Sequence, residues 1–122
     1  MELPEFRVFD HGDNRMRYAE IEHFDDMFGF RFEHKSPAAD MGDAEIEIMQ
    51  YSGLKGLREK KIFHKDIIDY QGVYYVVEIN FGGFGFYDRT QKWIWLYSIA
   101  PHCMVEGNIF ENPNLVPSSY KQ

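Results

Sequence analysis

Short hydrophobic runs separated by turn-forming residues dominate the sequence from Ile62 onward. The pairs Gln71-Gly72 and Gly82-Gly83 and the segment 89–92 interrupt these runs with residues that favour turns. Several short strands spaced by roughly ten residues are typical of a small barrel or sandwich, not of alternating helices and strands. The C-terminal part is therefore predicted to be all-β. The runs cover residues 62–70, 72–80, 84–87 and 93–99.

The N-terminal part carries a similar pattern. Residues 6–9 and 16–22 have the composition of strands, and the turn formers at 10–14 between them predict a β-hairpin. Residues 27–33 and 44–50 alternate apolar with polar side chains, which is the period of a partly buried strand. A further set of strands is therefore expected before residue 51.

Two segments interrupt the strand pattern. Residues 34–43 include Pro37 and Gly42 among small and polar residues, so they are the best candidate for a mobile connection. Residues 51–61 combine two glycines with several basic side chains and are too broken to predict a strand. We expect a turn or one short helical turn there.

Length and composition allow one compact domain. The 122 residues include 11 Phe, 8 Tyr and 2 Trp, and bulky planar side chains suit a pleated sheet better than a helix. A chain of this length buries enough surface to fold without disulfide or metal support. The prediction is a single, mainly β domain over residues 1–122.

The charge of the chain is unevenly distributed. The net charge is -7, which repels phosphate backbones and disfavours a general nucleic-acid binder. Residues 1–50 hold 13 acidic and 5 basic residues, a net charge of -8, whereas residues 51–122 hold 7 acidic and 8 basic residues, a net charge of +1. We therefore treat 1–50 as an acidic N-terminal β subdomain.

Targeting signals and disulfide pairs are not apparent in the sequence. Cys103 is the single cysteine and cannot form an internal disulfide, which fits a reducing compartment. The N-terminus lacks a basic start followed by an apolar run, and the longest apolar stretch, 93–100, is shorter than the roughly 20 residues that span a bilayer. A cytoplasmic protein without a membrane segment is expected.

Four short motifs occur in a recognisable order. They are FRVFD with MRY at 6–18, MQYSGLK at 49–55, IFHKDII at 62–68 and GNIFENPNL at 107–115. As a set they resemble the YopX family, small proteins associated with bacterial phages and prophages. The resemblance implies a mainly β fold whose second half, 51–122, is similar to an SH3-like barrel, with the N-terminal β-hairpin subdomain before it. It implies no activity, because the family is functionally uncharacterised.

The motif residues have structural interpretations. Gly53 and Gly107 suit turns or close backbone approach, Asn112 followed by proline suits the start of a turn, and Asp66 can accept hydrogen bonds from nearby amides. One departure concerns Lys65, which stands where the family pattern has glycine. Either the turn differs here, or its backbone angle was never unusual.

The patterns that suggest catalysis or cofactor binding are incomplete. The sequence GGFGFY at 82–87 is similar to the RNA-stacking motif of RRM domains, but Gly82 and Arg89 replace a required basic and a required aromatic residue. Asp88 stands where a dinucleotide-binding motif needs its last glycine. We favour a strand kinked by glycine, and expect no cofactor.

Metal and nucleophile patterns are similarly incomplete. The candidate ligands lack the close pairs of a zinc site, so no metal site is expected. The acidic residues lack the spacing of a calcium loop and suit a solvated connection. Nothing near Cys103 in the sequence would activate a thiolate, so a small buried residue is expected there. The candidates are His11, His23, His34, His64, His102, Asp25, Asp26, Asp40, Asp43 and Glu45.

Two groups of residues are candidates for binding. Trp93, Trp95 and Tyr97 would place three rings on one face of a predicted strand at 93–99, and such faces are either internal or part of an interface. A basic cluster could contact an acidic partner or the acidic half of another copy, although a solvated loop is the simpler interpretation. The cluster consists of Lys55, Arg58, Lys60, Lys61 and Lys65.

The leading hypothesis is a non-enzymatic, phage- or prophage-associated accessory protein in the bacterial cytoplasm that binds another protein or its own copies. The alternative is association with nucleic acid through the basic segment 55–65. An enzyme that uses Cys103 or the acidic residues is a third hypothesis, without a recognisable catalytic set.

Overall fold

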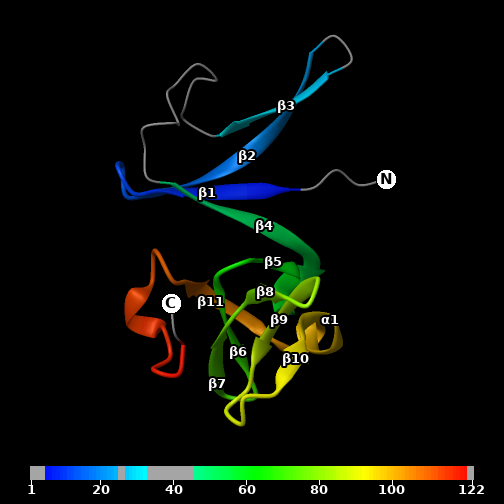
Figure 1. Cartoon of the computed structure of the whole chain (residues 1–122), viewed down its shortest axis with the longest axis vertical. Helices are drawn as coiled ribbons and strands as arrows, with labels where there is room; N and C mark the ends of the chain where they lie inside the picture. Colours follow the sequence, from blue (N-terminus) through cyan, green and yellow to red (C-terminus); the bar gives the residue numbers. More distant parts are fainter. Residues whose placement is uncertain (1–4, 25–26, 33–45, 121–122) are drawn as a thin grey trace. The chain divides into compact units, whose positions relative to one another are not determined.

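The computed structural model describes residues 5–24, 27–32 and 46–120 and confirms a mainly β chain (Figure 1). The chain divides into two compact units, Met1–Gln50 (unit 1) and Tyr51–Gln122 (unit 2), which are described separately. The predicted connection at 34–43 lies outside the described residues. So do His34, Asp25, Asp26, Asp40, Asp43 and Glu45.

Unit 1 is an antiparallel sheet in the strand order β3-β2-β1-β4. Its hairpin of β1 and β2 is the one expected from the turn formers at 10–14, and Phe9 pairs with Met16 across it. The carboxylate of Asp10 holds the turn, because its Oδ1 accepts hydrogen bonds from the amides of Gly12 (2.9 Å) and Asp13 (3.3 Å). The strands are β1 (Phe6–Asp10), β2 (Arg15–Phe24), β3 (Met27–Phe32) and the first half of β4 (Ile46–Lys55).

The interior of unit 1 is partly ionic. Arg7, Asp10 and Arg17 are buried, and Nε of Arg17 lies 3.6 Å from Oδ2 of Asp10. Arg17 also pairs with Asp13 at the hairpin turn. Buried charges are tolerated when they are paired, so these contacts both neutralise the buried charges and fix the hairpin. The buried apolar side chains of unit 1 are Val8, Phe9, Met16 and Met49.

Strand β4 is longer than the sequence predicts. The alternation indicated a strand that ends at Gln50, whereas β4 continues to Lys55 and pairs with β5 (Lys61–Phe63). Gly53 has a φ of +84°, and the register of the pairing shifts around it. A glycine bulge thus carries the strand through a segment that we expected to break. The short helical turn is present further on, as the 3₁₀ turn Leu57–Glu59.

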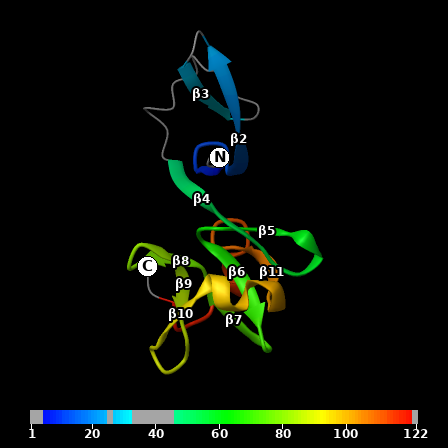
Figure 2. The same ribbon diagram turned by 90° about the vertical axis from the view of Figure 1, so that its right-hand side faces the viewer.

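Unit 2 contains two three-stranded antiparallel sheets, in the orders β11-β6-β7 and β10-β9-β8 (Figure 2). The chain passes from one sheet into the other at Val77, which follows directly after β7 and precedes β8. Short helical elements close the connections: α1 (Leu96–Ile99) and the 3₁₀ turns Ala100–His102 and Pro113–Leu115. The strands are β6 (Asp66–Tyr70), β7 (Val73–Val76), β8 (Glu78–Asn80), β9 (Gly83–Tyr87), β10 (Trp93–Trp95) and β11 (Met104–Asn108).

The core of unit 2 forms two clusters. The larger cluster includes Cys103, which is fully buried as predicted. The smaller cluster packs against the C-terminal segment, including Leu115 and Tyr120. The members of the larger cluster are Ile62, Ile68, Val77, Phe86, Leu96, Ile99, Ala100, Cys103 and Val105, and those of the smaller are Ile67, Val76 and Ile109.

The strand predicted at 93–99 is wrong in its second half. Strand β10 ends at Trp95, and α1 begins at Leu96. Leu96 and Ile99 are both buried, a spacing of three residues that places them on one side of a helical turn. The hydroxyl of Ser98 donates to the carbonyl of Trp95 at 2.7 Å and reinforces this turn. Burial of two aliphatic side chains therefore outweighs the strand preference of the aromatic residues.

Lys65 contradicts one of the two interpretations of its departure from the family pattern, namely that the backbone angle at this position is ordinary. Its φ is +72°, so the backbone does adopt the conformation that favours glycine, and a lysine occupies it. Its amide donates to the carbonyl of Val77 (2.9 Å), and its carbonyl accepts from the amide of Ile109 (3.2 Å). These two bonds tie the turn between β5 and β6 to distant segments and hold the backbone in this conformation.

Candidate functional site

Five aromatic residues of unit 2 form one continuous series of ring contacts, which we call the aromatic strip: Phe81, Tyr87, Trp93, Trp95 and Tyr97. Trp93 contacts Phe81 (5.6 Å between ring centroids), Tyr87 (5.0 Å) and Trp95 (5.7 Å), all edge to face. Trp95 and Tyr97 are stacked at 6.2 Å and 26°. Phe81 and Tyr97 at its ends are each 68% exposed. The strip is therefore a surface feature and not part of the core.

Two glycines of β9 make room for the tryptophans. A Cβ on Gly85 would lie 2.6 Å from Cζ2 of Trp93, and one on Gly83 would lie 2.8 Å from Cζ3 of Trp95. Real Cβ atoms do not approach other atoms this closely, so any larger residue would displace the rings. The GGFGFY sequence is thus a glycine-containing strand, as we favoured, and its glycines serve the packing of tryptophan.

A groove of about 660 Å³ borders the strip at Trp95 and Tyr97. Its wall is completed by Leu54 of β4 and Phe84 of β9, both partly buried. Among the described residues that line it, none is charged. An uncharged groove beside exposed rings is suited to apolar contacts. The lining consists of Ser52, Leu54, Gly82, Gly83, Phe84, Trp95 and Tyr97.

The structure distributes the basic candidates over the end of β4, the 3₁₀ turn and β5. Nζ of Lys55 lies 3.7 Å from Glu59, and Nζ of Lys61 lies 5.3 Å from the ring centroid of Tyr51. Arg58 and Lys60 are exposed in the 3₁₀ turn and at its end. Of these basic residues, Lys55 and Lys61 thus contact their own chain. Lys65 does the same through Tyr120.

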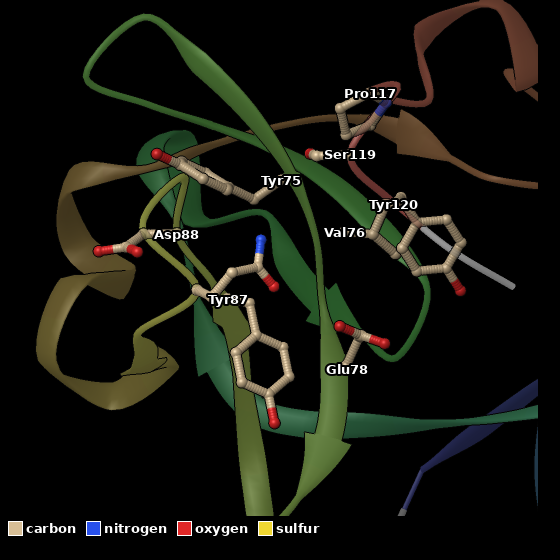
Figure 3. A pocket seen from close by; sticks show the side chains of 9 residues that line it. Tyr75, Val76, Glu78, Tyr87, Asp88, Pro117, Ser119 and Tyr120 are labelled. Carbon is tan, nitrogen blue, oxygen red and sulfur yellow. The ribbon is translucent and has the colours of Figure 1, made fainter.

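A cavity of about 310 Å³ in unit 2 was not predicted from the sequence (Figure 3). Three tyrosines line it, Tyr75 from β7, Tyr87 from β9 and Tyr120 from the C-terminal segment, together with Glu78 of β8. The carboxylate of Glu78 lies between the rings of Tyr87 and Tyr120 in Figure 3. The other lining residues are Val76, Asp88, Gln91, Pro117 and Ser119. Because these residues are far apart in the sequence, no local spacing could have indicated the cavity.

Cys103 is in an unfavourable setting for a nucleophile. Burial raises the pKa of its thiol to about 11, and the negative charge of Asp66 acts in the same direction. The thiol donates to the carbonyl of Ala100 at 3.3 Å. It is therefore protonated at neutral pH, whereas nucleophilic cysteines need the thiolate. Within the described ranges, no group of three or more potential ligands could hold a metal ion.

Comparison with known proteins identifies the family. A family model described as YopX protein matches residues 5–117. The chain belongs to the YopX family. The resemblance drawn from the four motifs is thereby confirmed.

The fold of this YopX-family protein has a counterpart among solved structures. The crystal structure of protein EF1440 from Enterococcus faecalis superposes with a TM-score of 0.63 and 19% sequence identity, over 94% of this chain and 99% of that chain. At this identity the similarity shows the fold alone. A search of curated proteins finds no match. Over the residues that the structure describes, no helix has the length and apolar character to cross a membrane.

The YopX motif residues have structural roles in this chain. Oδ2 of the buried Asp66 accepts a hydrogen bond from the amide of Phe63 at 2.7 Å. Gly107 leaves space for the side chain of Asn112, whose Oδ1 accepts from the amide of Asn108 at 3.1 Å. These interactions fix turns on either side of the β6–β11 pair. The motifs that identify the family are therefore distinct from the aromatic strip and the cavity.

Proposed function

We propose that this YopX-family chain is a non-enzymatic accessory protein of a phage or prophage, and that it acts in the bacterial cytoplasm by binding another protein or its own copies. The observation that carries the proposal is the aromatic strip, five rings in mutual contact with 68% exposure at both ends. Tyrosine and tryptophan are enriched in the central contacts of protein interfaces. The raised pKa of Cys103 supports a non-enzymatic role.

The strip is suited to a contact that excludes water. Edge-to-face contacts hold Trp93 in place. Because Gly83 and Gly85 have no side chains, both tryptophan rings can lie directly against β9. A partner would therefore meet rings that lose little conformational freedom on binding. The adjoining groove offers further apolar surface at Leu54 and Phe84.

We further propose an SH3-like barrel for residues 51–122 and an acidic β-hairpin subdomain for residues 1–50, which together form one YopX domain. The arrangement of unit 2 supports the barrel proposal, because the chain runs without a break through Val77 from one small antiparallel sheet into the other.

Nucleic-acid association through residues 55–65 has less support, since Lys55 and Lys61 contact their own chain. Failure to bind nucleic acid even at low ionic strength would eliminate that alternative.

The test uses the double variant Phe81→Ser/Tyr97→Ser and the matched control Leu57→Ser, which changes an exposed apolar residue outside the strip. Mass is measured by light scattering, and partners are captured from host lysate and identified. We expect self-association or a specific captured protein with the wild type and the control, and its loss with the double variant. A monomeric wild type that captures no protein, or equal capture by all three chains, contradicts the proposal.

A further inference from the structure

The tyrosine-lined cavity combines aromatic rings with one uncommitted carboxylate. Glu78 is partly buried, and within the described chain no hydrogen bond or ion pair is formed by its side chain. Partly buried carboxylates are usually paired, because desolvation is costly for a charge. Glu78 lines the cavity together with Tyr87 and Tyr120, and in the view of Figure 3 its carboxylate appears between their two rings.

The three tyrosine rings are held from outside the cavity. Tyr75 stacks on the buried Phe86 at 4.4 Å and 27°. The hydroxyl of Tyr87 accepts a hydrogen bond from Nδ2 of Asn80 at 3.0 Å. The hydroxyl of Tyr120 accepts from Nζ of Lys65 at 2.8 Å. The rings are thus fixed before any ligand arrives, which lowers the entropic cost of binding.

The charges around the cavity are partly committed to the chain itself. Oδ1 of Asp88 accepts from the amides of Thr90 (2.8 Å) and Lys92 (3.0 Å), and from the hydroxyl of Thr90. These hydrogen bonds lower the pKa of Asp88, so it remains ionised, but its side chain points away from the other labelled side chains in Figure 3. Glu78 is therefore the carboxylate available to a ligand.

The nearby cation Lys65 leaves the face of Tyr120 open. Its Nζ lies 2.8 Å from the hydroxyl oxygen of Tyr120 and 5.5 Å from the ring centroid. These two distances place the ammonium at the hydroxyl end of the ring rather than above its centre. Lys65 thus orients Tyr120 without occupying the position in which a second cation would contact the ring.

We infer that this cavity binds an alkylammonium group, with Glu78 as its counter-ion and the faces of Tyr75, Tyr87 and Tyr120 as its walls. Aromatic faces attract cations within about 6 Å of the ring centre, and tyrosine cages recognise ammonium groups in this way. The volume of about 310 Å³ is at the lower end of the roughly 300–1,000 Å³ typical of ligand sites, so a compact group fits best. The inference is independent of the aromatic strip, apart from the shared Tyr87.

The ammonium group can come from a free polyamine or from a lysine side chain of a peptide, so the experiment has two arms. Calorimetric titrations use putrescine in one arm and a short lysine-containing peptide in the other, with 1-butanol as an uncharged analogue. Saturable binding of putrescine alone assigns the site to free amines, and tighter binding of the peptide assigns it to lysine side chains. Butanol binding as tightly as putrescine would overturn charge recognition.

Glu78→Gln keeps the shape of the side chain and removes its charge. We expect it to weaken ammonium binding by about tenfold, equivalent to ~1.4 kcal/mol. The matched control is Glu106→Gln, an exposed strand carboxylate that does not line the cavity, and its affinity should equal that of the wild type. Tyr120→Leu, which removes one wall, is the second variant and should also weaken binding.

Besides equally tight binding of butanol, three results would overturn the inference. They are the absence of saturable binding of both ammonium probes at millimolar concentration, unchanged affinity in Glu78→Gln, and equal weakening by Glu106→Gln. Thermal melting of each variant checks that it is folded. Because Phe81 and Tyr97 do not line the cavity, their serine variants should retain ammonium binding even if they lose protein partners.

Discussion

At the scale of single residues, Gly85 determines whether an indole can lie on the surface of β9. We expect Gly85→Ala to destabilise the fold by about 1–3 kcal/mol, because the added methyl group overlaps both the carbonyl oxygen of Ile94 and the ring of Trp93, so the strand must shift. It should also change tryptophan fluorescence. Urea denaturation and emission spectra measure the two effects.

The control for this substitution is Gly72→Ala. Gly72 has a φ of +80° with open space around it, so alanine there is strained but meets no atoms. A loss of roughly 1 kcal/mol is expected, without a change in the emission spectrum. Identical spectral changes in both variants would show that ring packing is not what requires glycine at position 85.

The buried thiol of Cys103 makes stability depend on pH in the alkaline range. Its pKa is raised from 9.0 to about 11 in the folded protein, so the folded state holds the proton more tightly than the unfolded state. The contribution of the protonated thiol to the free energy of unfolding is complete below the pKa of the unfolded state and is lost as the pH rises through the pKa of the folded state. Wild-type stability should therefore fall by up to about 2–3 kcal/mol more than that of Cys103→Ala across this range. Denaturant midpoints of both proteins measured against pH give the comparison, and parallel curves would contradict it.

Residue-level predictions from the sequence succeeded where a side chain acts locally. Asp66 and Asn112 have the turn roles that their chemistry indicated, whereas Gly53 lies in the bulge of β4 and not in a turn. Lys65 could not be predicted, because its positive φ depends on hydrogen bonds to Val77 and Ile109, which are distant in the sequence.

At the scale of elements, pattern and burial explain both the agreements and the errors. The short hydrophobic run at 84–87, bounded by turn formers, predicts β9 correctly. The same reasoning fails for α1, since Leu96 and Ile99 are both required in the core. Sequence reasoning also fails for β4, where a glycine bulge continues the strand beyond the end predicted at Gln50.

The turn between β5 and β6 depends on one buried acceptor. Asp66→Ala should destabilise unit 2 by about 1–3 kcal/mol, because the amide of Phe63 loses its 2.7 Å hydrogen bond in a buried position. Asp66→Asn retains an acceptor and should cost less. Urea midpoints distinguish the two variants, and equal losses would indicate that the charge of Asp66 matters more than its hydrogen bond.

At the scale of the whole molecule, each unit has buried residues of its own. Both tryptophans lie in unit 2, so tryptophan fluorescence follows that unit, whereas circular dichroism follows all strands. Val8→Ala, at a fully buried position of unit 1, should lower the dichroism midpoint in urea and leave the fluorescence midpoint unchanged. Ile68→Ala, in the core of unit 2, should lower the fluorescence midpoint. A fluorescence midpoint that falls equally in both variants would indicate a single cooperative transition.

Sequence reasoning at this scale identified the family and the mainly β class but missed the cavity. The motifs are local and ordered, and so they can be read directly. The cavity, by contrast, joins Tyr75, Tyr87 and Tyr120, which meet only after the strands of unit 2 pair and the C-terminal segment packs. The spacing of residues in the sequence therefore could not predict this cavity.

The edge-to-face arrangement of Trp93 and Trp95 also gives the protein an intrinsic optical signal. Two indoles 5.7 Å apart and inclined at 87° are close enough for their electronic transitions to couple. Such coupling produces an exciton couplet whose amplitude and sign depend on the mutual orientation of the rings. Any ligand that reorients either indole would alter this couplet, so contact with this face can be followed without a label.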